Sequence, residues 1–290
     1  MAKCAFIGLG IMGYPMAGHL QAKGHDVRVY NRTTAKAEAW ARQHGGRTAA
    51  TPRAAADGAE LVLMCVGNDD DIRSVAHGDD GALAGLGQGC VLVDHTTASA
   101  DIARELEAAA KDQGKQFVDA PVSGGQAGAE NGTLTIMCGG EQAAFERARP
   151  VMEAYGRAVT LMGPAGAGQL TKMVNQICIA GLVQGLAEAL NFGMRAGLDM
   201  DQVIAVISKG AAQSWQMDNR APTMVQGKFD FGFPVMWMRK DLKICLEEAN
   251  RNGALLPTIA LIDQCYHQVI KAGGARWDTS SLIHNLQLLD

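Results

Sequence analysis

The sequence lacks a basic excess. Twenty-six Lys and Arg residues stand against 30 Asp and Glu, which gives a formal net charge of −4. Nucleic acids and anionic membrane surfaces both attract proteins with a clear positive excess. We therefore expect neither a nucleic acid nor a membrane among the partners of this chain. Long charged or low-complexity tracts are also missing, and the apolar content of 48% indicates a folded rather than a disordered chain.

The seven cysteines lack any paired spacing. They are scattered and odd in number, with no CxxC pair and no Cys/His cluster at the spacing of a zinc site. Their neighbours are mostly apolar, which is typical of reduced thiols in a protein core. The first residues, MAKCAFIGLG, run directly into an apolar strand pattern without the layout of a signal peptide. These features predict no metal site and a cytoplasmic location.

An uninterrupted apolar run of membrane-spanning length is absent as well. A span needs about 20 predominantly apolar residues. The most apolar late stretch, residues 173–194, contains polar side chains throughout and predicts a long buried helix of a soluble protein. The interrupting residues are Asn175, Gln176, Gln184, Glu188 and Asn191.

Strand and helix signals alternate through the first half of the chain and then give way to helical periodicity alone. Buried strands that alternate with helices indicate a parallel sheet with both faces covered. GPAGAG, at residues 163–168, is the expected hinge. With 290 residues for two cores, we predict an α/β Rossmann domain with a doubly wound parallel sheet over residues 1–163, followed by an all-α domain over residues 164–290, linked by a long helix. The predicted strands are 3–8, 26–30, 61–66, 91–94, 116–119, 133–138 and 158–161. The predicted helices are 13–22, 35–44, 54–56, 99–113, 141–155, 169–196, 200–209, 222–227, 238–250 and 257–272.

A glycine motif follows the first predicted strand. Its residues are Gly8, Leu9, Gly10, Ile11, Met12 and Gly13. Gly8 permits a tight turn, Gly10 lets the backbone approach a pyrophosphate, and Gly13 allows close packing of the next helix. The N–H groups at the start of that helix then face the phosphates. A GxGxxG is weak evidence alone, but its place between a strand and a helix favours a dinucleotide site over a turn without a ligand.

The end of the second strand indicates which dinucleotide is bound. NAD-binding chains normally carry an acidic residue there for the ribose diol, whereas this chain has Asn31, Arg32 and Thr33. Arg32 offers a planar fork of donors for a 2′-phosphate, and Thr33 offers a hydroxyl. A solvated surface cation is the alternative interpretation of Arg32. NADP(H) is the favoured cofactor, and NAD(H) is possible.

Two further strand ends are expected to line the same crevice. Gly67, beside Val66, leaves room for the dinucleotide, and Thr96 is placed to orient the nicotinamide or the substrate. His95 is more typical of a hydrogen-bonded structural histidine than of a catalytic one. The consecutive acids at residues 69–71 indicate helix capping and solvated charge rather than a metal site.

Two later segments carry candidate substrate groups. In DAPVSGG, Ser123, Gly124 and Gly125 form either a carboxylate-binding nest or an ordinary tight turn. In GAGQLTKMVNQ, Lys172 precedes Asn175 and Gln176 by three and four residues, so that all three share one side of a helix. A lysine in an apolar helix is paired, snorkelling or catalytic, and this segment alone does not choose between these roles.

GLGIMG, DAPVSGG and GAGQLTKMVNQ, in this order and spacing, resemble the β-hydroxyacid dehydrogenase family. The family includes 3-hydroxyisobutyrate dehydrogenase, tartronate semialdehyde reductase and the succinic semialdehyde reductases. The resemblance extends over essentially the whole chain, as far as Lys240-Asp241-Leu242. It implies the two-domain fold predicted above, with the active site in the cleft between the domains.

The resemblance also implies roles for particular residues. Lys172 is expected to be the catalytic acid and base, with Thr96 beside the nicotinamide and the substrate. Lys240 is expected near the cofactor, and an amide partner of the lysine is supplied by Asn175 or Gln176. The substrate carboxylate is expected to bind at Ser123, Gly124 and Gly125. Asn31-Arg32-Thr33 resembles the NADP-preferring reductases of the family.

The predicted function is an NADP(H)-dependent interconversion of a small carboxylate-bearing semialdehyde and its hydroxyacid. An imine reductase of related fold is one alternative, although such enzymes generally lack the lysine, and a non-catalytic NADP-binding protein is another. A 6-phosphogluconate dehydrogenase is disfavoured, because the all-α part of about 125 residues is too short for that enzyme's pattern. The apolar helical half predicts a homodimer or homotetramer.

Overall fold

The computed structural model describes residues 1–287, and its chain divides into two compact units. Unit 1 is Met1–Lys172 and unit 2 is Met173–Asp290. The predicted domain boundary, after residue 163, lies nine residues before the observed boundary after Lys172. The first turn of the linking helix thus belongs to unit 1. That one domain binds the cofactor and the other completes the substrate site stays a prediction.

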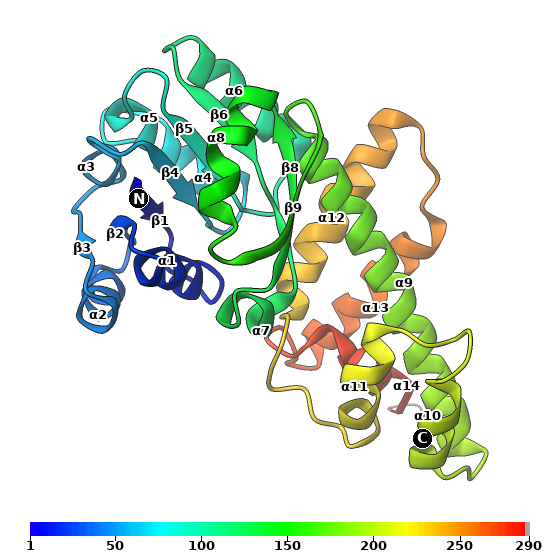
Figure 1. Cartoon of the computed structure of the whole chain (residues 1–290). Coiled ribbons are helices and arrows are strands. Elements are labelled where there is room, and N and C mark those ends of the chain that lie inside the picture. Colours follow the sequence, from blue (N-terminus) through cyan, green and yellow to red (C-terminus); the bar gives the residue numbers. More distant parts are fainter. Residues whose placement is uncertain (288–290) are drawn as a thin grey trace. The chain divides into compact units, whose positions relative to one another are not determined.

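Unit 1 contains one mixed sheet between two layers of helices (Figure 1). The strand order is β3-β2-β1-β4-β5-β6-β8-β7, and β9 lies beside β8. From β3 to β6 all pairs are parallel, in the order of a doubly wound dinucleotide-binding sheet. The predicted Rossmann fold is thus confirmed. The strands are β1 (Lys3–Ile7), β2 (Asp26–Tyr30), β3 (Arg47–Thr48), β4 (Leu61–Met64), β5 (Val91–Asp94), β6 (Gln116–Asp119), β7 (Val122–Ser123), β8 (Leu134–Gly140) and β9 (Gly156–Gly163).

The sheet departs from the predicted parallel arrangement at β8, which runs antiparallel to both β6 and β7. The connection from β7 to β8 contains only the short helix α7 (Gly125–Glu130). A parallel return would need a crossover of about a dozen residues or more that carries the chain back along the sheet. The short connection therefore reverses the strand direction.

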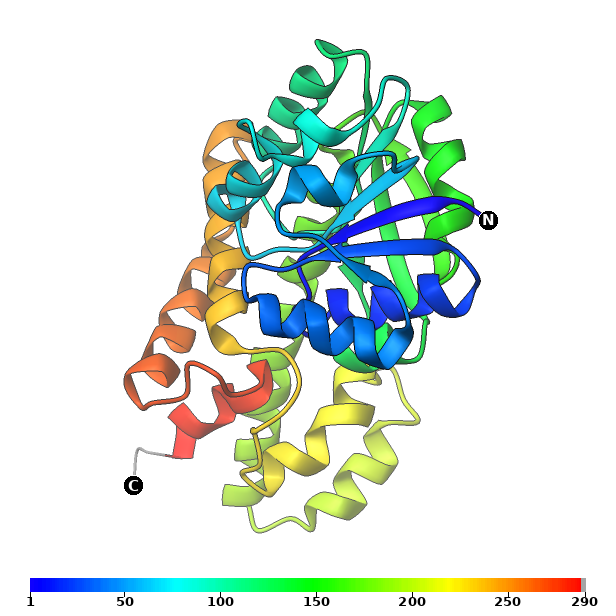
Figure 2. The ribbon, with the colours of Figure 1, turned by 90° about the vertical axis from the view of Figure 1, so that its left-hand side faces the viewer.

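Alternate residues of the central strands point to opposite faces of the sheet. Cys4 and Phe6 of β1 face one helical layer, and Ala5 and Ile7 face the other. Because both faces are covered, these strands are apolar along their whole length. The first layer, visible in Figures 1 and 2, contains α1 (Gly13–Ala22), α2 (Thr34–His44), α7 and α8 (Gln142–Met152). The second layer contains α3 (Pro52–Ala56), α4 (Asp69–Ala76), α5 (Ala82–Gly85) and α6 (Ala100–Lys111).

Unit 2 is helical, as predicted. Its first helix, α9 (Ala167–Arg195), begins in unit 1 and continues into unit 2. The helix predicted at 222–227 begins earlier, because Ser214 accepts a hydrogen bond from the Met217 N–H and so caps α11. Pro222 lies inside that helix, where proline is unfavourable, and this hid its first turns from the sequence analysis. The other helices are α10 (Met200–Ile207), α11 (Trp215–Val225), α12 (Val235–Asn252), α13 (Pro257–Lys271), a 3₁₀ turn (Thr279–Ser281) and α14 (Leu282–Gln287).

Within residues 1–287, α9 is the one helix whose length and apolar composition would suffice to cross a membrane. A core helix of a soluble protein meets the same criteria, so this is weak evidence for a span. Only 33% of its most apolar window is buried in the chain. The expectation of a buried helix was therefore wrong for much of its surface, where Val174, Leu182 and Phe192 are exposed.

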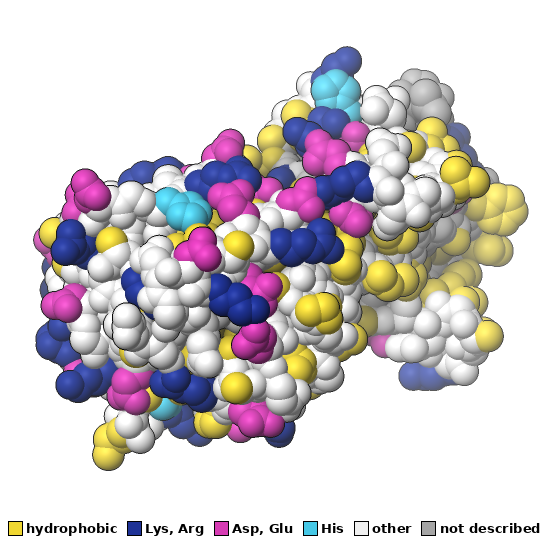
Figure 3. Space-filling view, turned by 90° about the horizontal axis from the view of Figure 1, so that it is seen from above, with side chains coloured by type: hydrophobic (Ala, Val, Ile, Leu, Met, Phe, Trp, Pro, Cys, Tyr) yellow, Lys and Arg dark blue, Asp and Glu magenta, His cyan; other side chains and the backbone are white. Residues whose placement is uncertain are grey.

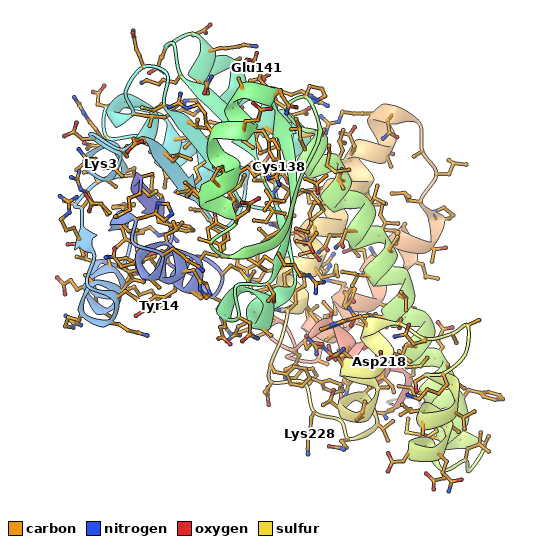
Figure 4. All side chains as sticks on the ribbon, viewed as in Figure 1. Lys3, Tyr14, Cys138, Glu141, Asp218 and Lys228 are labelled. Carbon is orange, nitrogen blue, oxygen red and sulfur yellow. The ribbon has the colours of Figure 1, made fainter. Side chains whose placement is uncertain are left out.

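None of the seven cysteines, all of which lie in the described part of the chain, forms a disulfide. Burial raises the pKa of the Cys4 and Cys138 thiols to about 12. Both groups are therefore protonated and unreactive at neutral pH. Cys138 lies within the layers of unit 1 (Figure 4). Cys178, on α9, is exposed and departs from the expectation of core cysteines.

Acidic and basic side chains are interspersed over the face of the molecule shown in Figure 3. Exposed ion pairs of the chain include Lys111 with Glu141 at 2.6 Å and Arg149 with Glu153 at 2.8 Å. Pairs of this kind each contribute about 0–1 kcal/mol. The surface pattern matches the small net charge.

Candidate active site

The glycine turn after β1 shows which of its three glycines the protein itself requires. Gly8 has a φ of +93°, and a Cβ there would lie 2.3 Å from the Cys65 carbonyl oxygen. A Cβ at Gly13 would lie 2.0 Å from the Gly8 carbonyl oxygen. At Gly10, by contrast, an added Cβ would meet no protein atom within 4 Å. Packing explains Gly8 and Gly13, whereas glycine at position 10 fits close approach by a ligand such as a pyrophosphate.

The side chain of Asn31 connects this turn to the end of β2. Its Oδ1 accepts a hydrogen bond from the Leu9 N–H at 2.9 Å, and its Nδ2 donates to the Thr33 carbonyl oxygen at 3.0 Å. Both polar groups of Asn31 are thus used by the backbone of unit 1. Asn31 holds the glycine turn in place, a contribution that the sequence analysis did not foresee. Within the turn, Leu9 is buried and Ile11 is exposed.

Arg32 extends from the end of β2 into solvent. Its side chain is 86% exposed, and its Nη1 lies 3.3 Å from Oδ1 of Asp71. Asp71 belongs to the first turn of α4, where Asn68 caps the helix by accepting the Asp71 N–H. The guanidinium is therefore available to an anion, but with a carboxylate beside it. From the sequence, Asp71 was expected only to cap the helix or to face solvent.

Thr96 joins the carboxyl ends of β4 and β5. Its Oγ1 accepts the Val66 N–H at 3.0 Å, and its own N–H donates to Oδ1 of Asp94 at 2.9 Å. Burial raises the pKa of Asp94 to about 7, although the hydrogen bonds from Thr96 act in the opposite direction. Thr96 and the Val66-Gly67 segment are brought together at this edge of the sheet, as the sequence predicted for neighbouring strand ends. The sequence did not predict a role for Asp94. An acidic residue at the end of an otherwise apolar strand was the signal that could have identified it.

His95 is held by the protein on both sides of its ring. Nδ1 lies 2.7 Å from the Ala120 carbonyl oxygen and Nε2 lies 2.8 Å from the Tyr155 hydroxyl. Burial lowers the pKa of this imidazole to about 4, so the ring is neutral at physiological pH. These contacts are those of a structural histidine.

The first turn of α9 is bound to the ends of β5 and β6. Asp119, the last residue of β6, accepts the Gly166 N–H at 2.7 Å and the Gln169 N–H at 2.9 Å. Gln169 donates from Nε2 to the Thr96 carbonyl oxygen at 2.7 Å. Lys172 follows Gln169 by three residues and is 7% exposed. The structure thus places Lys172 one helical turn from a polar network that includes Thr96, and the sequence analysis did not identify Asp119 or Gln169 as part of it.

The predicted carboxylate loop begins on β7 and ends in α7. Ser123 pairs with Thr135 of β8. The two residues after it have positive φ angles, +134° at Gly124 and +61° at Gly125. Such a succession is readily adopted only by glycine, so the loop conformation depends on both residues.

In unit 2, two of the predicted site residues contact the buried Asp241, and a third is hydrogen-bonded to one of them. Gln176 donates from Nε2 to Oδ2 of Asp241 at 2.5 Å, and Lys240 Nζ lies 3.3 Å from Oδ1. Asn175 donates from Nδ2 to Oε1 of Gln176 at 2.8 Å. Both ends of the Gln176 amide are therefore engaged within the protein. The sequence predicted no role for Asp241, which the tertiary structure places beside these residues.

Two family models match the chain, one after the other. Residues 3–163 match the NAD binding domain of 6-phosphogluconate dehydrogenase. Residues 166–286 match the NAD-binding domain of NADP-dependent 3-hydroxyisobutyrate dehydrogenase. The boundary between the matches lies in the predicted hinge.

Relatives match the chain over nearly its whole length. An uncharacterized oxidoreductase of Shewanella frigidimarina is 63% identical over 99% of both chains. The 2-hydroxy-3-oxopropionate reductase of Escherichia coli is 32% identical over 99% of this chain and 98% of its own. The solved structure of Mycobacterium tuberculosis 3-hydroxyisobutyrate dehydrogenase with L-serine is 31% identical, with a TM-score of 0.90 over 99% of both chains. The chain therefore belongs to the 3-hydroxyisobutyrate (β-hydroxyacid) dehydrogenase family and is an NAD(P)-dependent oxidoreductase of that type.

Proposed function

We propose that the protein interconverts a small carboxylate-bearing semialdehyde and the corresponding hydroxyacid, with NADP(H) as the preferred cofactor. The observation that carries the proposal is the placement of Lys172, one turn after a helix start that is hydrogen-bonded to Thr96 and Asp119. The names of two relatives support the substrate class. Both 2-hydroxy-3-oxopropionate and L-serine are three-carbon carboxylates with oxygen on the third carbon.

The cofactor site comprises the glycine turn and the neighbouring strand ends. When bound, the nicotinamide cofactor supplies or accepts the hydride. The open space beside Gly10 fits the pyrophosphate, and Arg32 binds the 2′-phosphate that distinguishes NADP from NAD. The proposed cofactor residues are Gly8, Leu9, Gly10, Ile11, Met12, Gly13, Asn31, Arg32, Thr33, Val66, Gly67, Thr96 and Lys240.

Lys172 is the proposed acid and base. During reduction its ammonium donates a proton to the developing alkoxide oxygen, and during oxidation its amine takes the hydroxyl proton. A well-placed acid or base contributes about 10²–10⁴-fold to the rate. The loop of Ser123, Gly124 and Gly125 supplies donors for the substrate carboxylate, as its two positive φ angles allow.

Asn175 is the proposed amide partner of the substrate, with Gln176 in a supporting part. Gln176 is 2% exposed and bonds to Asp241 and Asn175 through both ends of its amide. Asn175 is partly exposed and lies three residues after Lys172, on the same side of α9.

A substrate screen tests the proposed reaction. NADPH and NADH are each assayed with glyoxylate, succinic semialdehyde, methylmalonate semialdehyde and tartronate semialdehyde. We expect NADPH to be oxidised faster than NADH with at least one of them. No oxidation of either cofactor by any of these compounds would favour a non-catalytic dinucleotide-binding protein.

Lys172→Ala tests the proposed acid and base. We expect kcat to fall about 10²–10⁴-fold, while the Kd for NADPH, measured by fluorescence titration, stays within about twofold. Lys271→Ala, at the exposed end of α13, is the matched control and retains full activity. If Lys172→Ala retained most of the wild-type kcat, Lys172 would not be the acid and base of the reaction.

We also propose a homodimer or homotetramer. Large apolar side chains on the helices of unit 2 remain exposed in the single chain, and a second copy would cover them. Light scattering after gel filtration measures the mass, and a monomer at micromolar concentration contradicts this proposal. The exposed residues include Val174, Leu182, Phe192, Val206 and Leu261. The cytoplasmic location stays a prediction.

A further inference from the structure

Gln169 is a buried amide whose hydrogen bonds connect two elements that both carry proposed site residues. It lies in the first turn of α9 and is 1% exposed. Nε2 donates to the Thr96 carbonyl oxygen at 2.7 Å, and Oε1 accepts the Ala98 N–H at 3.0 Å. One side chain thus binds a donor and an acceptor of the segment that follows β5.

The backbone of the same helical turn is held from a second side. Oδ1 of Asp119 accepts the Gly166 N–H, and Oδ2 accepts the Gln169 N–H. A carboxylate at a helix N-terminus is stabilising, because the unpaired N–H groups there carry partial positive charge. The start of α9 is therefore fixed to β6 as well as to β5.

Two glycines, Gly168 and Gly139, allow the start of α9 to lie close to β8. A Cβ at Gly168 would lie 2.4 Å from the Met137 carbonyl oxygen, and a Cβ at Gly139 would lie 2.8 Å from the Gly168 nitrogen. Side chains at either position would separate α9 from β8. The helix therefore rests directly on the sheet backbone, with little freedom to shift.

We propose that Gln169 is a positioning residue for the reaction, which sets the place of Lys172 relative to Thr96. Lys172 lies three residues after Gln169, on the same side of the helix. The two hydrogen bonds of the Gln169 side chain fix the first turn of α9, both in its rotation about the helix axis and in its position along that axis, relative to the segment that contains Thr96. This inference rests on the proposed function, since it takes Lys172 to be the acid and base. Misplacement of a reacting group by about 1 Å can lower a rate about 10²-fold.

Two substitutions separate the hydrogen bonds of Gln169 from its volume. Gln169→Met keeps the length of the side chain and removes both polar ends. Gln169→Glu keeps the acceptor for the Ala98 N–H but places a second oxygen against the Thr96 carbonyl oxygen. An ionised carboxylate is repelled there, whereas a protonated carboxyl donates to Thr96 as the amide does. Gln142→Met, at an exposed position of α8, is the matched control.

The assay uses NADPH and 2-hydroxy-3-oxopropionate (tartronate semialdehyde), with Lys172→Ala measured alongside. We expect Gln169→Met to lower kcat about 10- to 100-fold while the KM for NADPH stays within about twofold. The activity of Gln169→Glu, divided by that of Gln169→Met, rises as the pH falls from 8 to 5.5, because protonation restores the missing donor. Asp94, Asp119, His95 and Lys172 are present in both variants, so this ratio removes their contributions to the pH dependence.

Hydrogen exchange supplies a readout that needs no substrate. The amides of Ala98 and of residues 166–169 exchange faster in Gln169→Met than in the wild type, and those of Gln142→Met do not.

Wild-type kcat in Gln169→Met overturns the inference. So does a Gln169→Glu to Gln169→Met activity ratio that is independent of pH, since a purely structural loss would not be reversed by protonation. An active Lys172→Ala enzyme contradicts the proposed function instead. If the wild type reduces none of the semialdehydes, the catalytic part of the inference fails with the proposed function, and unchanged exchange in Gln169→Met overturns the anchoring part.

Discussion

The guanidinium of Arg32 lies 3.3 Å from the carboxylate of Asp71, at the edge of unit 1 where a 2′-phosphate is expected. The pair joins the end of β2 to the first turn of α4. Asp71 neutralises part of the charge that is proposed to select NADP. We therefore expect the proposed preference for NADP to depend on two residues of opposite charge rather than on Arg32 alone.

Asp71→Asn is expected to strengthen NADPH binding about two- to fivefold and to leave NADH binding unchanged. An exposed pair of this kind is worth up to about 1 kcal/mol, and about 1.4 kcal/mol corresponds to a tenfold change in affinity. Fluorescence titration of both cofactors measures the effect. Asp70→Asn is the control, because Asp70 lies in the same turn but pairs with Arg73. Equal changes in the affinities for NADPH and NADH would show that Asp71 does not affect recognition of the 2′-phosphate.

Gly10→Ala and Gly13→Ala are expected to fail in different ways. The Cβ of Gly10→Ala meets no protein atom within 4 Å, so the melting temperature is unchanged while dinucleotide affinity falls at least tenfold. The Cβ of Gly13→Ala would lie 2.0 Å from the Gly8 carbonyl oxygen and lowers the melting temperature. Thermal unfolding with and without NADPH distinguishes the two variants. Normal NADPH binding by Gly10→Ala argues against a pyrophosphate at this turn.

Asp94 makes stability depend on pH. Burial raises its pKa from 3.8 to about 7, so the folded state binds this proton more tightly than the unfolded state. The resulting stabilisation is complete below about pH 4 and is lost as the pH rises through about 7, a change on the order of a few kcal/mol. The side chain of Asp94→Asn stays neutral at every pH. The free energy of unfolding of the variant minus that of the wild type therefore increases from about pH 4 to about pH 7 and is constant above that.

Urea unfolding at several pH values measures this difference. His95, Asp69 and Asp119 are present in both proteins, and their contributions cancel to first order when the two curves are subtracted. A difference that is constant from pH 4 to pH 8 would show that the carboxyl of Asp94 is not held protonated by burial.

Asn175→Ala and Gln176→Met separate substrate contact from structural support. Loss of the proposed substrate amide in Asn175→Ala raises the KM for the semialdehyde about tenfold with little change in melting temperature. Gln176→Met removes the donor to the buried Asp241 and destabilises the protein by about 1–3 kcal/mol. Steady-state kinetics and thermal unfolding measure both effects. The reverse assignment, with the KM effect at position 176, would give the substrate contact to Gln176.

Much of the fold is visible in the sequence because its long elements have strong periodicity. The apolar strands of the parallel sheet, the glycine turn and the long helices were predicted at nearly their observed places. Short elements such as β3, β7, α5 and α7 were missed, since two to six residues carry too little pattern. The antiparallel direction of β8 depends on the length of its connection to β7 and on its pairing with β6 and β7, and local periodicity predicts neither.

The sequence by itself determined the chemistry: a dinucleotide turn, a candidate lysine and the family to which their spacing belongs. Only the tertiary structure decided the supporting network. It brought Thr96, Asp119 and Gln169 together, although they lie 47 or more residues from their partners across α9 and the sheet. It also placed Asp71 beside Arg32, and Asp241 against Gln176 and Lys240. The physical reason is that glycine turns are recognisable from local backbone requirements, whereas a buried polar group is satisfied by whichever donor the fold carries to it.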